Sequence, residues 1–272
     1  MEHPNVSSVY GPVKSWRLGR SLGVDLLCID SICSFDCVYC QLGKINQLTT
    51  ERHTFVPTAT LIRDLKASDW RHSDVVTISG SGEPTLALNL GEAIDAIKSI
   101  TGRTVIVLTN STLLGDPEVR RDLLKADRVY CKLDAWNDDQ LRRINRPVTT
   151  ISHEAIVDGI IALRNEFDGV IAIQTMVLTH LSEADIARYA KVLTAIKPDE
   201  VQINIPSRPV PADWEIENRG NRTEPDDHAK ILKIVEPAEL LRVADRIEEL
   251  TLLPVITPPA FRRESPKAAP AA

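Results

Sequence analysis

Residues 33–40 read Cys33-Ser34-Phe35-Asp36-Cys37-Val38-Tyr39-Cys40, and they follow an apolar, strand-like run at residues 23–30. The three thiols have the spacing CxxxCxxC. A closed iron–sulfur cluster takes four cysteines and a structural zinc site takes four Cys or His ligands, so three thiols leave either site one ligand short. A cubane held by three thiolates keeps one iron open for an external ligand. The spacing therefore predicts an open cluster bound by Cys33, Cys37 and Cys40.

A zinc site is the alternative for these thiols, with His53 or Cys28 as the fourth ligand. Zinc ligands usually come as two CxxC-like pairs in a small, loop-rich unit, and this long α/β chain shows no second pair. A disulfide framework is disfavoured further, because the chain has five cysteines in 272 residues and no secretory signal. Cys28 and Cys131, outside the triplet, are expected to be small buried apolar side chains. A non-catalytic metal-binding or redox-sensing protein is the hypothesis from another functional class.

The composition is that of an ordinary globular protein, with 43% apolar and 26% charged residues. Its length allows one or two domains. No apolar run is long enough to cross a bilayer, and the first residues lack the features of a signal peptide, so we expect a cytoplasmic protein without a membrane partner. The net charge of −6 argues against a general electrostatic grip on nucleic acid.

Apolar, β-branched runs alternate with amphipathic segments at a step of roughly 30 residues, which is the rhythm of βα units around a parallel sheet. The runs are residues 23–30, 75–79, 104–110, 128–135, 170–178 and 200–205. Six such units predict an α/β fold, a partial (βα)6 TIM-like barrel open along one side, with a doubly wound open sheet as the alternative. Ligands gather at the carboxyl ends of the strands in both architectures.

Helices are expected to begin at Pro117, Glu183 and Pro237, because the first two follow a capping Asp or Ser and proline is favoured at the first helical position. From residue 206 to residue 227 the pattern breaks down into prolines and charges, as in a functional loop or a disordered stretch. Four of its side chains would suit a cap over the barrel mouth: Arg208, Trp214, Arg219 and Arg222. The chain is therefore divided into an N-terminal segment (1–22), the barrel (23–206), a loop with a C-terminal helical and extended cap (207–263), and a disordered tail (264–272).

A second motif, Ser79-Gly80-Ser81-Gly82-Glu83-Pro84-Thr85-Leu86, stands at the end of the second predicted strand. Glycines let a backbone approach an ammonium group closely, and carbonyls or Glu83 can accept its protons. Read alone, Gly-x-Gly after a strand also fits a nucleotide-binding loop or a tight turn.

Other strand ends carry polar residues where an apolar core would not place them. Period-2 alternation puts Lys132 and Asp134 on one face of their strand. A barrel interior that binds a polar, zwitterionic ligand needs such groups, because buried polar atoms must be paired. A purely structural Lys–Asp contact is the alternative interpretation. The candidate binding residues at these ends are Asn110, Lys132, Asp134, Gln174 and Asn204.

The cysteine triplet with Tyr39, and Ser81-Gly82-Glu83-Pro84 in the register of a GGEP motif, resemble the radical S-adenosylmethionine (radical SAM) enzymes. The resemblance implies a partial barrel of that type and a [4Fe-4S] cluster whose open iron chelates S-adenosylmethionine. It implies reductive cleavage of that cofactor to a 5′-deoxyadenosyl radical, which abstracts hydrogen from a substrate. An electron donor such as flavodoxin or ferredoxin is then required.

The same resemblance assigns the candidate residues to parts of the cofactor. It places the backbone of Tyr39 at the adenine edge. The ribose or the carboxylate is expected at Lys132 or Asp134. The remaining cofactor contacts are Gly82, Glu83, Pro84, Asn110, Gln174 and Asn204.

A narrower similarity rests on several shorter stretches. They are Tyr10-Gly11-Pro12-Val13, residues 17–25, Gln41-Leu42-Gly43, Asn145-Arg146-Pro147, and residues 202–204 leading to Arg208-Pro209. Together they are similar to small bacterial and archaeal radical SAM proteins grouped with the wyosine-type tRNA-modifying synthetases. The chain departs from that pattern at Lys14 and Trp16, and it lacks the extra cysteines and long flanking domains of the tRNA-modifying members. The expected substrate is a nucleobase, free or in an RNA such as tRNA, or a small metabolite, with a peptide or protein side chain as the alternative.

Overall fold

An eight-stranded sheet forms the centre of the computed structural model, which describes residues 6–206, 208–220 and 228–261. Its strands, in spatial order, are β1 (Val9–Ser15), β2 (Gly19–Val24), β5 (Val75–Ile78), β6 (Thr104–Thr109), β7 (Arg128–Lys132), β8 (Val170–Met176), β9 (Glu200–Asn204) and β10 (Val255–Ile256). β1 is antiparallel to β2, and every other neighbouring pair is parallel. Two short parallel strands, β3 (Ile32–Cys33) and β4 (Gln47–Leu48), form a separate sheet.

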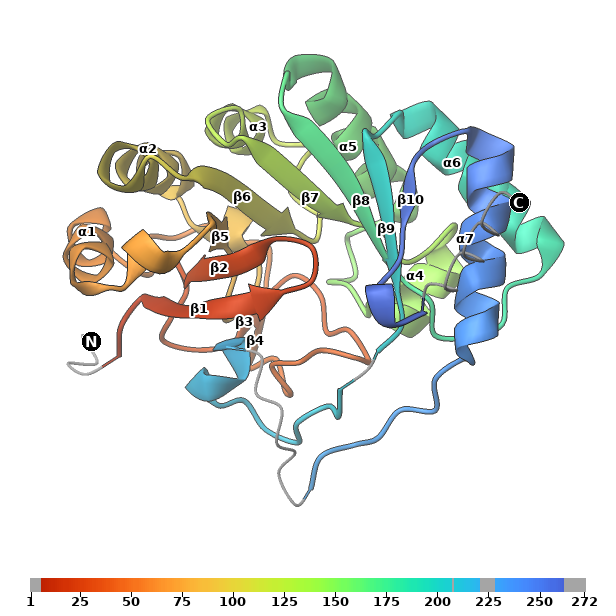
Figure 1. Ribbon diagram of the computed structural model, residues 1–272, viewed down its shortest axis with the longest axis horizontal. Helices are drawn as coiled ribbons and strands as arrows, with labels where there is room; N and C mark the ends of the chain where they lie inside the picture. Colours follow the sequence, from red (N-terminus) through yellow and green to blue (C-terminus); the bar gives the residue numbers. More distant parts are fainter. Residues whose placement is uncertain (1–5, 207, 221–227, 262–272) are drawn as a thin grey trace, which may run out of the picture.

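The helices lie along the outer side of the curved sheet (Figure 1). They are α1 (Thr58–Ala67), α2 (Leu90–Thr101), α3 (Pro117–Leu123), α5 (His153–Glu166), α6 (Glu183–Ile196) and α7 (Pro237–Thr251). The short α4 (Asp138–Ile144) lies instead near the carboxyl ends of the strands, and 3₁₀ turns span Trp70–His72, Pro84–Leu86, Ile216–Gly220 and Pro259–Phe261. The predicted helix starts at Pro117, Glu183 and Pro237 are confirmed.

The strand order decides between the two predicted architectures. From β2 to β9 each parallel strand pairs with the parallel strand before it in the chain. A doubly wound sheet would reverse direction at a switch point, whereas a barrel adds its strands in one rotational sense. The sheet is therefore an open half-barrel, which confirms the predicted partial barrel and excludes the doubly wound sheet.

Three details of the sheet differ from the predicted strands. The first strand spans Gly19–Val24 rather than residues 23–30, because the Asp25 carboxylate accepts hydrogen bonds from the backbone N–H groups of Leu27 and Cys28 and so turns the chain out of the sheet. β1 and β10 were not predicted. β1 contains Gly and Pro, which argue against a strand but are tolerated at a sheet edge, and β10 is only two residues long.

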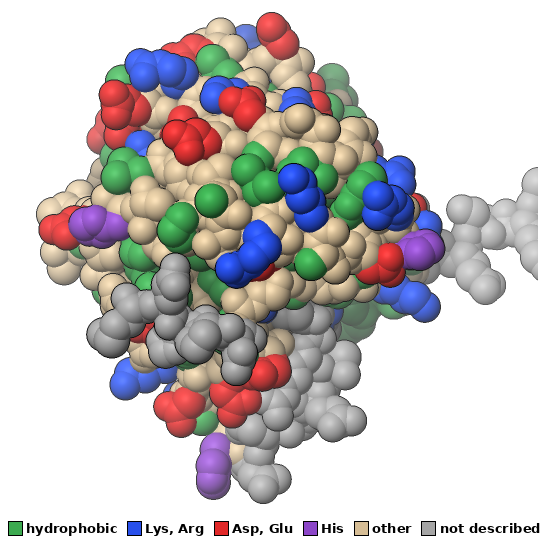
Figure 2. Space-filling model, turned by 90° about the vertical axis from the view of Figure 1, so that its left-hand side faces the viewer, with side chains coloured by type: hydrophobic (Ala, Val, Ile, Leu, Met, Phe, Trp, Pro, Cys, Tyr) green, Lys and Arg blue, Asp and Glu red, His purple; other side chains and the backbone are tan. Residues whose placement is uncertain are grey.

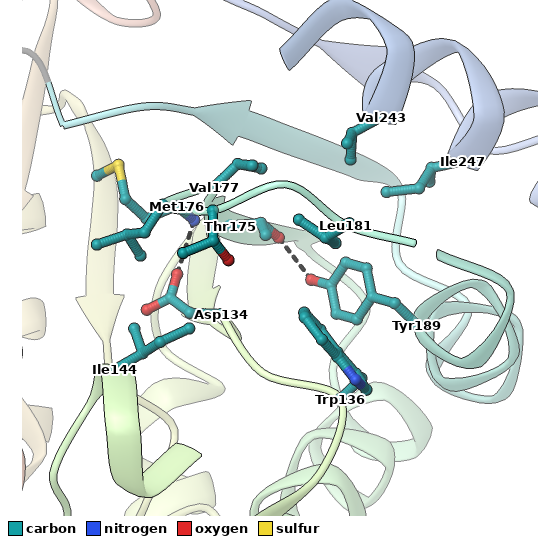
Figure 3. Close-up of a pocket in the computed structure, with 12 residues that line it drawn as sticks. Asp134, Trp136, Ile144, Thr175, Met176, Val177, Leu181, Tyr189, Val243 and Ile247 are labelled. Atoms are coloured by element: carbon teal, nitrogen blue, oxygen red, sulfur yellow. Dashed lines mark hydrogen bonds between the residues drawn. The ribbon is translucent and has the colours of Figure 1, made fainter. Parts of the chain in front are cut away.

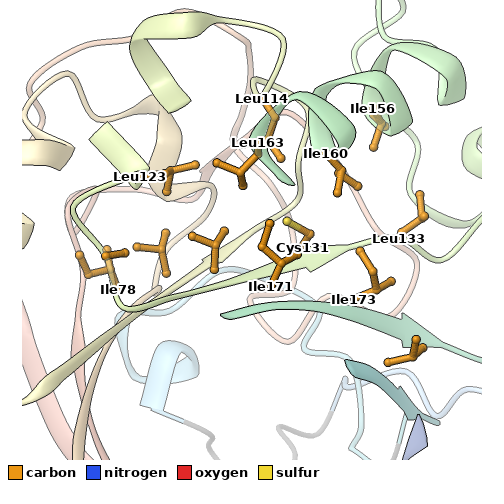
Figure 4. Packing of buried hydrophobic residues seen from close by; sticks show 14 of the residues in the cluster. Ile78, Leu114, Leu123, Cys131, Leu133, Ile156, Ile160, Leu163, Ile171 and Ile173 are labelled. Atoms are coloured by element: carbon orange, nitrogen blue, oxygen red, sulfur yellow. The ribbon is translucent and has the colours of Figure 1, made fainter. Parts of the chain in front are cut away.

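The main hydrophobic core lies between the sheet and the helices (Figure 4). Valine and isoleucine side chains from alternate strand positions pack there against leucines and isoleucines of the helices. Cys131 is fully buried in this layer beside Ile171 and Leu163, as the sequence predicted for a small apolar side chain. Alternation along β7 consequently turns Tyr130 and Lys132 toward the inside of the half-barrel.

Some predictions concern residues that the structure does not describe. Arg222 and Asp227 of the expected cap and the expected tail at residues 264–272 lie outside the described residues. The division into a segment, a barrel, a cap and a tail stays a prediction. No helix in the described ranges is both long and apolar enough to span a bilayer. The face in Figure 2 carries Lys and Arg interspersed with Asp and Glu side chains.

Candidate functional site

Backbone hydrogen bonds fasten the cysteine loop on two sides, to the segment after β5 and to the end of α4. On one side the Ile32 N–H donates to Ser81 O at 2.9 Å, and the Glu83 N–H donates to Ile32 O at 3.0 Å. On the other side the Val38 N–H donates to Ile144 O at 2.9 Å. The loop is thus suspended between the segment after β5 and the end of α4, so its cysteines stand over the carboxyl ends of the strands.

Gly82 makes the first of these attachments possible. Its φ of +152° lies in a region that glycine tolerates best, and a Cβ at this position would lie 1.6 Å from Ile32 O. The glycine that the sequence assigned to the cofactor's ammonium group is therefore already in close contact with the cysteine loop. Pro84, which follows shortly, is buried and begins the 3₁₀ turn Pro84–Leu86.

The three thiols are partly buried and influence one another electrostatically. Burial raises the pKa of Cys33 well above its ordinary value, and the charges of Glu83 and Cys37 add to the shift. Burial and the charge of Cys40 raise the pKa of Cys37 to about 12, and burial raises that of Cys40 to about 11. Metal binding must therefore displace protons from these groups.

Each sulfur also receives a hydrogen bond. The Phe35 N–H donates to Cys33 Sγ at 3.4 Å, and the backbone of Leu42 bonds to Cys40. Asn145 Nδ2 donates to Cys37 Sγ at 3.3 Å. Within the described ranges no three His, Cys, Asp or Glu side chains gather closely enough to share one metal ion. A cubane does not require its three thiolates to converge on one metal ion, since each thiolate binds its own iron.

Asp134 is the polar centre beside Cys37. Its Oδ1 accepts from Met176 N at 2.7 Å and pairs with Lys132 Nζ at 3.2 Å. Its Oδ2 accepts from Asn145 Nδ2 at 2.7 Å and from the Tyr39 hydroxyl. The Lys132 ammonium also lies 4.8 Å from the centroid of the Tyr39 ring. Lys132 and Asp134 thus make the Lys–Asp contact that was the alternative interpretation of the pattern, and they make it directly against the cysteine loop. Their role in binding a ligand stays a prediction.

Glu83 faces inward rather than toward a ligand. Its carboxylate is buried and accepts hydrogen bonds from Thr85 N and Oγ1, from Thr109 Oγ1 at 2.6 Å and from Asn110 N at 2.6 Å. Burial raises its pKa, and these bonds act in the opposite direction. Glu83 therefore joins the ends of β5 and β6 and fixes the backbone of Asn110.

The remaining predicted residues lie at different distances from the cysteines. Asn110 Nδ2 donates to Ser34 Oγ at 2.8 Å and reaches Cys33 Sγ at 3.5 Å. Gln174 pairs in register with Lys132, and its Nε2 donates to Gln202 Oε1 at 2.9 Å. Asn204 pairs in register with Met176, one strand further on. The structure thus brings Tyr39, Asn110, Lys132 and Asp134 to the cysteine loop, with Gln174 and Asn204 continuing along the inner wall.

The described part of the expected cap packs against the cysteine loop. A Cβ on Gly43 would lie 2.5 Å from Asp213 O. Asn218 Nδ2 donates to Leu42 O at 3.4 Å, and Gln41 Nε2 donates to Pro209 O at 3.4 Å. We call residues 208–220 the strap.

Arg219 of the strap contacts residues at the β1–β2 edge of the sheet, and no pattern in the sequence pointed to these partners. Its guanidinium donates to Asp25 Oδ2 at 3.3 Å, to Cys28 Sγ at 3.1 Å and to Ser7 O at 2.7 Å. It also lies 5.0 Å from the centroid of the Tyr10 ring. Cys28, one of the two candidates for a fourth zinc ligand, is thus in contact with Arg219. The other candidate, His53, is 62% exposed and packs edge-on against Phe55.

A narrow pocket lies on the other side of Asp134, between the ends of β7 and β8 and helices α6 and α7 (Figure 3). Trp136 and Met176 line it beside Asp134, and a hydrogen bond between Thr175 Oγ1 and the Tyr189 hydroxyl closes one side. Its other walls are apolar, including Val243 and Ile247 of α7. Asp134 therefore separates this pocket from the cysteines.

Comparisons with known proteins show which family the chain is similar to. The family model described as Radical SAM superfamily matches residues 29–193. A UPF0026 protein of Synechocystis sp. is 47% identical over 251 residues, covering 91% of this chain and 95% of that protein. A UPF0026 protein of Methanocaldococcus jannaschii is 32% identical over 206 residues, covering 74% of this chain and 64% of its own length.

A solved structure shares the fold. Streptococcus suis SuiB bound to S-adenosylmethionine superposes with a TM-score of 0.60 at 16% identity, over 84% of this chain and 48% of that chain. The chain thus spans about half the length of that structure. At this identity the likeness supports the half-barrel architecture. The narrower wyosine-type grouping stays a prediction.

Proposed function

The chain belongs to the radical SAM superfamily of enzymes, and from that premise we propose that Cys33, Cys37 and Cys40 hold a [4Fe-4S] cluster with one iron left open for S-adenosylmethionine. When bound and reduced, the cluster would supply the electron that cleaves S-adenosylmethionine to methionine and a 5′-deoxyadenosyl radical, which abstracts hydrogen from the substrate. The observation that carries the proposal is the partly buried thiol triplet on one loop, with a hydrogen-bond donor at each sulfur.

The residues around the loop fit such a group. A [4Fe-4S] cluster needs thiolates shielded from bulk water and hydrogen bonds to sulfur that tune its potential. The thiols are partly buried, and backbone bonds that do not depend on a metal fasten the loop to the segment after β5 and to the end of α4. A buried amide oxygen beside Cys37, Oδ1 of Asn145, also has no hydrogen-bond partner in the described structure. Such an orphaned acceptor fits a place where another molecule completes the bonding.

Several side chains then bind the zwitterionic cofactor. Lys132 offers an ammonium group to its carboxylate or ribose, and Asp134 holds Lys132 and the Tyr39 hydroxyl in place. The backbone of Tyr39 meets the adenine edge, and the backbone of Gly82 and Pro84 faces the amino group. Glu83 acts through Asn110, whose backbone it fixes, because its own carboxylate already accepts bonds from within the chain. Gln174 and Asn204 extend the polar wall.

For the substrate we propose a nucleobase, free or in RNA, or a small metabolite. The side-chain amides of Gln174 and Gln202 run along the inner wall and hydrogen-bond to each other, so each keeps further capacity to donate or accept. Amides of this kind can read the donor and acceptor pattern of a base edge. A flavodoxin- or ferredoxin-type protein would deliver the electron.

Anaerobic reconstitution with iron and sulfide tests the proposal. We expect a brown, oxygen-sensitive protein with about four irons per chain, whose reduced spectrum changes when S-adenosylmethionine is added. Under strong reductant it should convert S-adenosylmethionine to 5′-deoxyadenosine. Cys37→Ala should abolish both signals. Cys28→Ala is the matched control and should retain them, because Cys28 is bonded to Arg219.

Two outcomes would contradict the proposal. The first is a colourless protein with stoichiometric zinc that is lost in Cys28→Ala. The second is a cluster that forms but never yields 5′-deoxyadenosine. Deuterium transfer from labelled nucleosides or metabolites into 5′-deoxyadenosine would then identify the substrate, and transfer from a labelled peptide would favour the peptide alternative.

A further inference from the structure

Asn145 is a buried amide of the Asn145-Arg146-Pro147 stretch, and its effect on a bound cluster has not been considered above. It is the residue after α4, is 1% exposed, and places Nδ2 3.3 Å from Cys37 Sγ. The same nitrogen donates to Asp134 Oδ2 at 2.7 Å and lies 3.4 Å from the Tyr39 hydroxyl. The side chain therefore connects a cysteine sulfur to the polar centre of the site.

The orientation of this amide is set by its surroundings. The Asn145 N–H donates to Leu141 O at 2.8 Å, and its carbonyl accepts from Asp36 N at 2.9 Å, so the backbone is held from the helix and from the cysteine loop. A flipped side chain would place its carbonyl oxygen against the Asp134 carboxylate, which is electrostatically unfavourable. The N–H group is thus directed at Asp134 and Cys37.

What sets Asn145 apart from other buried asparagines is the sulfur that its nitrogen contacts. Oδ1 of Asn145 is buried and accepts no hydrogen bond in the described structure, and an unmet buried acceptor costs free energy of folding. The amide is kept in spite of that cost. What it provides is a donor at the sulfur of Cys37.

Resting on the proposed function, we infer that Asn145 is a positioning residue that raises the reduction potential of the cluster. One-electron reduction adds negative charge that the thiolate sulfurs share, and an N–H group at sulfur stabilises the more negative state more strongly. The donors at Cys33 and Cys40 are backbone groups, apart from Asn110 at 3.5 Å from Cys33. Asn145 is therefore the donor that a side-chain substitution removes most cleanly.

The test is a potentiometric titration of reconstituted protein, followed by the electron paramagnetic resonance signal of the reduced cluster. Asn145→Leu keeps the approximate shape and removes the donor. We expect the equilibrium constant for reduction to fall about tenfold, which for one electron is a downward shift of about 59 mV. Asn89→Leu is the matched control: Asn89 is also a buried asparagine with an unpaired Oδ1, but its Nδ2 bonds to Val56 O and Thr58 Oγ1 next to α1. Its potential should equal that of the wild type.

Every outcome decides the inference. If Asn145→Leu binds as much iron as the wild type and keeps the wild-type potential, Asn145 does not tune the cluster, while the proposed function stands. Asn145→Ala, which removes the amide altogether, serves if the leucine variant does not fold and should also lower the potential. If neither variant takes up iron, Asn145 is needed for the cluster to assemble rather than for its reduction potential, and the inference is overturned. A wild type without a cluster would remove the proposed function and the inference together.

Discussion

Gly82 allows the cysteine loop to approach the segment after β5 closely, because glycine has no side chain. With a methyl group at this position the Cβ would lie 1.6 Å from Ile32 O, and the backbone has a φ of +152°. We expect Gly82→Ala to lower the free energy of unfolding by about 3 kcal/mol or more, because both the overlap and the strained φ must be relieved. The variant should also lose iron on reconstitution. Urea denaturation and iron analysis measure the two effects.

Gly115→Ala is the control for this substitution. A Cβ on Gly115 would meet no atom within 4 Å, so the change should stay within about 0.5 kcal/mol. If Gly82→Ala unfolds at the wild-type urea concentration and keeps its iron, the close approach of the loop to the strand end is wrong.

Among single residues, the sequence predicted which residue types form the site but not the direction in which their side chains point. The CxxxCxxC spacing singled out the three thiols, and period-2 alternation placed Lys132 and Asp134 on one face, where they form an ion pair. The inward turn of Glu83 could not be foreseen, since a Gly-Glu-Pro stretch does not state which way its carboxylate points. The bond between Asn145 and Cys37 joins residues 108 positions apart and leaves no local pattern.

At the scale of elements, an ionic cluster joins α7 to the start of α6. Hydrogen bonds from Arg242 and from the Leu181 N–H lower the pKa of Glu239 from 4.5 to about 2. A carboxylate with a depressed folded-state pKa stabilises the fold above its unfolded pKa, and this contribution is lost as the pH falls through the folded pKa. We expect Glu239→Gln to lower the free energy of unfolding at pH 7 by about 1 kcal/mol. The difference from the wild type should shrink between pH 4.5 and about pH 2.

Chemical denaturation across this pH range measures the effect. Glu249→Gln is the control, because Glu249 is 61% exposed and pairs with Arg246 on the same helix; it should change little at any pH. A gap between Glu239→Gln and wild type that is the same at pH 7 and pH 2.5 would show that the carboxylate does not carry this linkage.

The helices and strands that were predicted correctly are those with a long, uninterrupted hydrophobic pattern. The long apolar runs gave the central strands, and capping residues gave the starts of α3 and α6. The first strand was placed too late because residues 26–28 are apolar as well, and only the bonds to Asp25 reveal the turn. β1 was missed because Gly11 and Pro12 hide an edge strand.

At the scale of the whole molecule, the half-barrel has two free edges, at β1 and β10. Arg219 ties the strap to the first of them through Asp25 and Ser7. We expect Arg219→Ala to free the strap, because a largely buried guanidinium with several acceptors is lost. Hydrogen–deuterium exchange of residues 208–220 should speed up about tenfold, the factor that corresponds to roughly 1.4 kcal/mol of local stability.

Arg121→Ala serves as the control, because Arg121 is 70% exposed and pairs weakly with Glu118 on the same helix. Unchanged exchange in Arg219→Ala would mean that the contacts of Gly43 and Asn218 hold the strap without it. That residues 206–227 form a cap stays a prediction from their composition; the strap, which the structure describes, packs against the cysteine loop. The partners of Arg219 were not, since Asp25 lies 194 positions earlier.

During synthesis on the ribosome, every parallel strand from β5 to β9 finds its neighbour already made, because strand order in the sheet follows chain order. The strap comes later, and only then are Gln41, Leu42 and Gly43 covered. A nascent polypeptide that stops before residue 208 therefore has all its cysteines and the ends of β2 to β9, with this flank of the thiol loop still bare. Iron and sulfide delivered at that moment would reach the cysteine loop from a side that the strap covers in the finished protein.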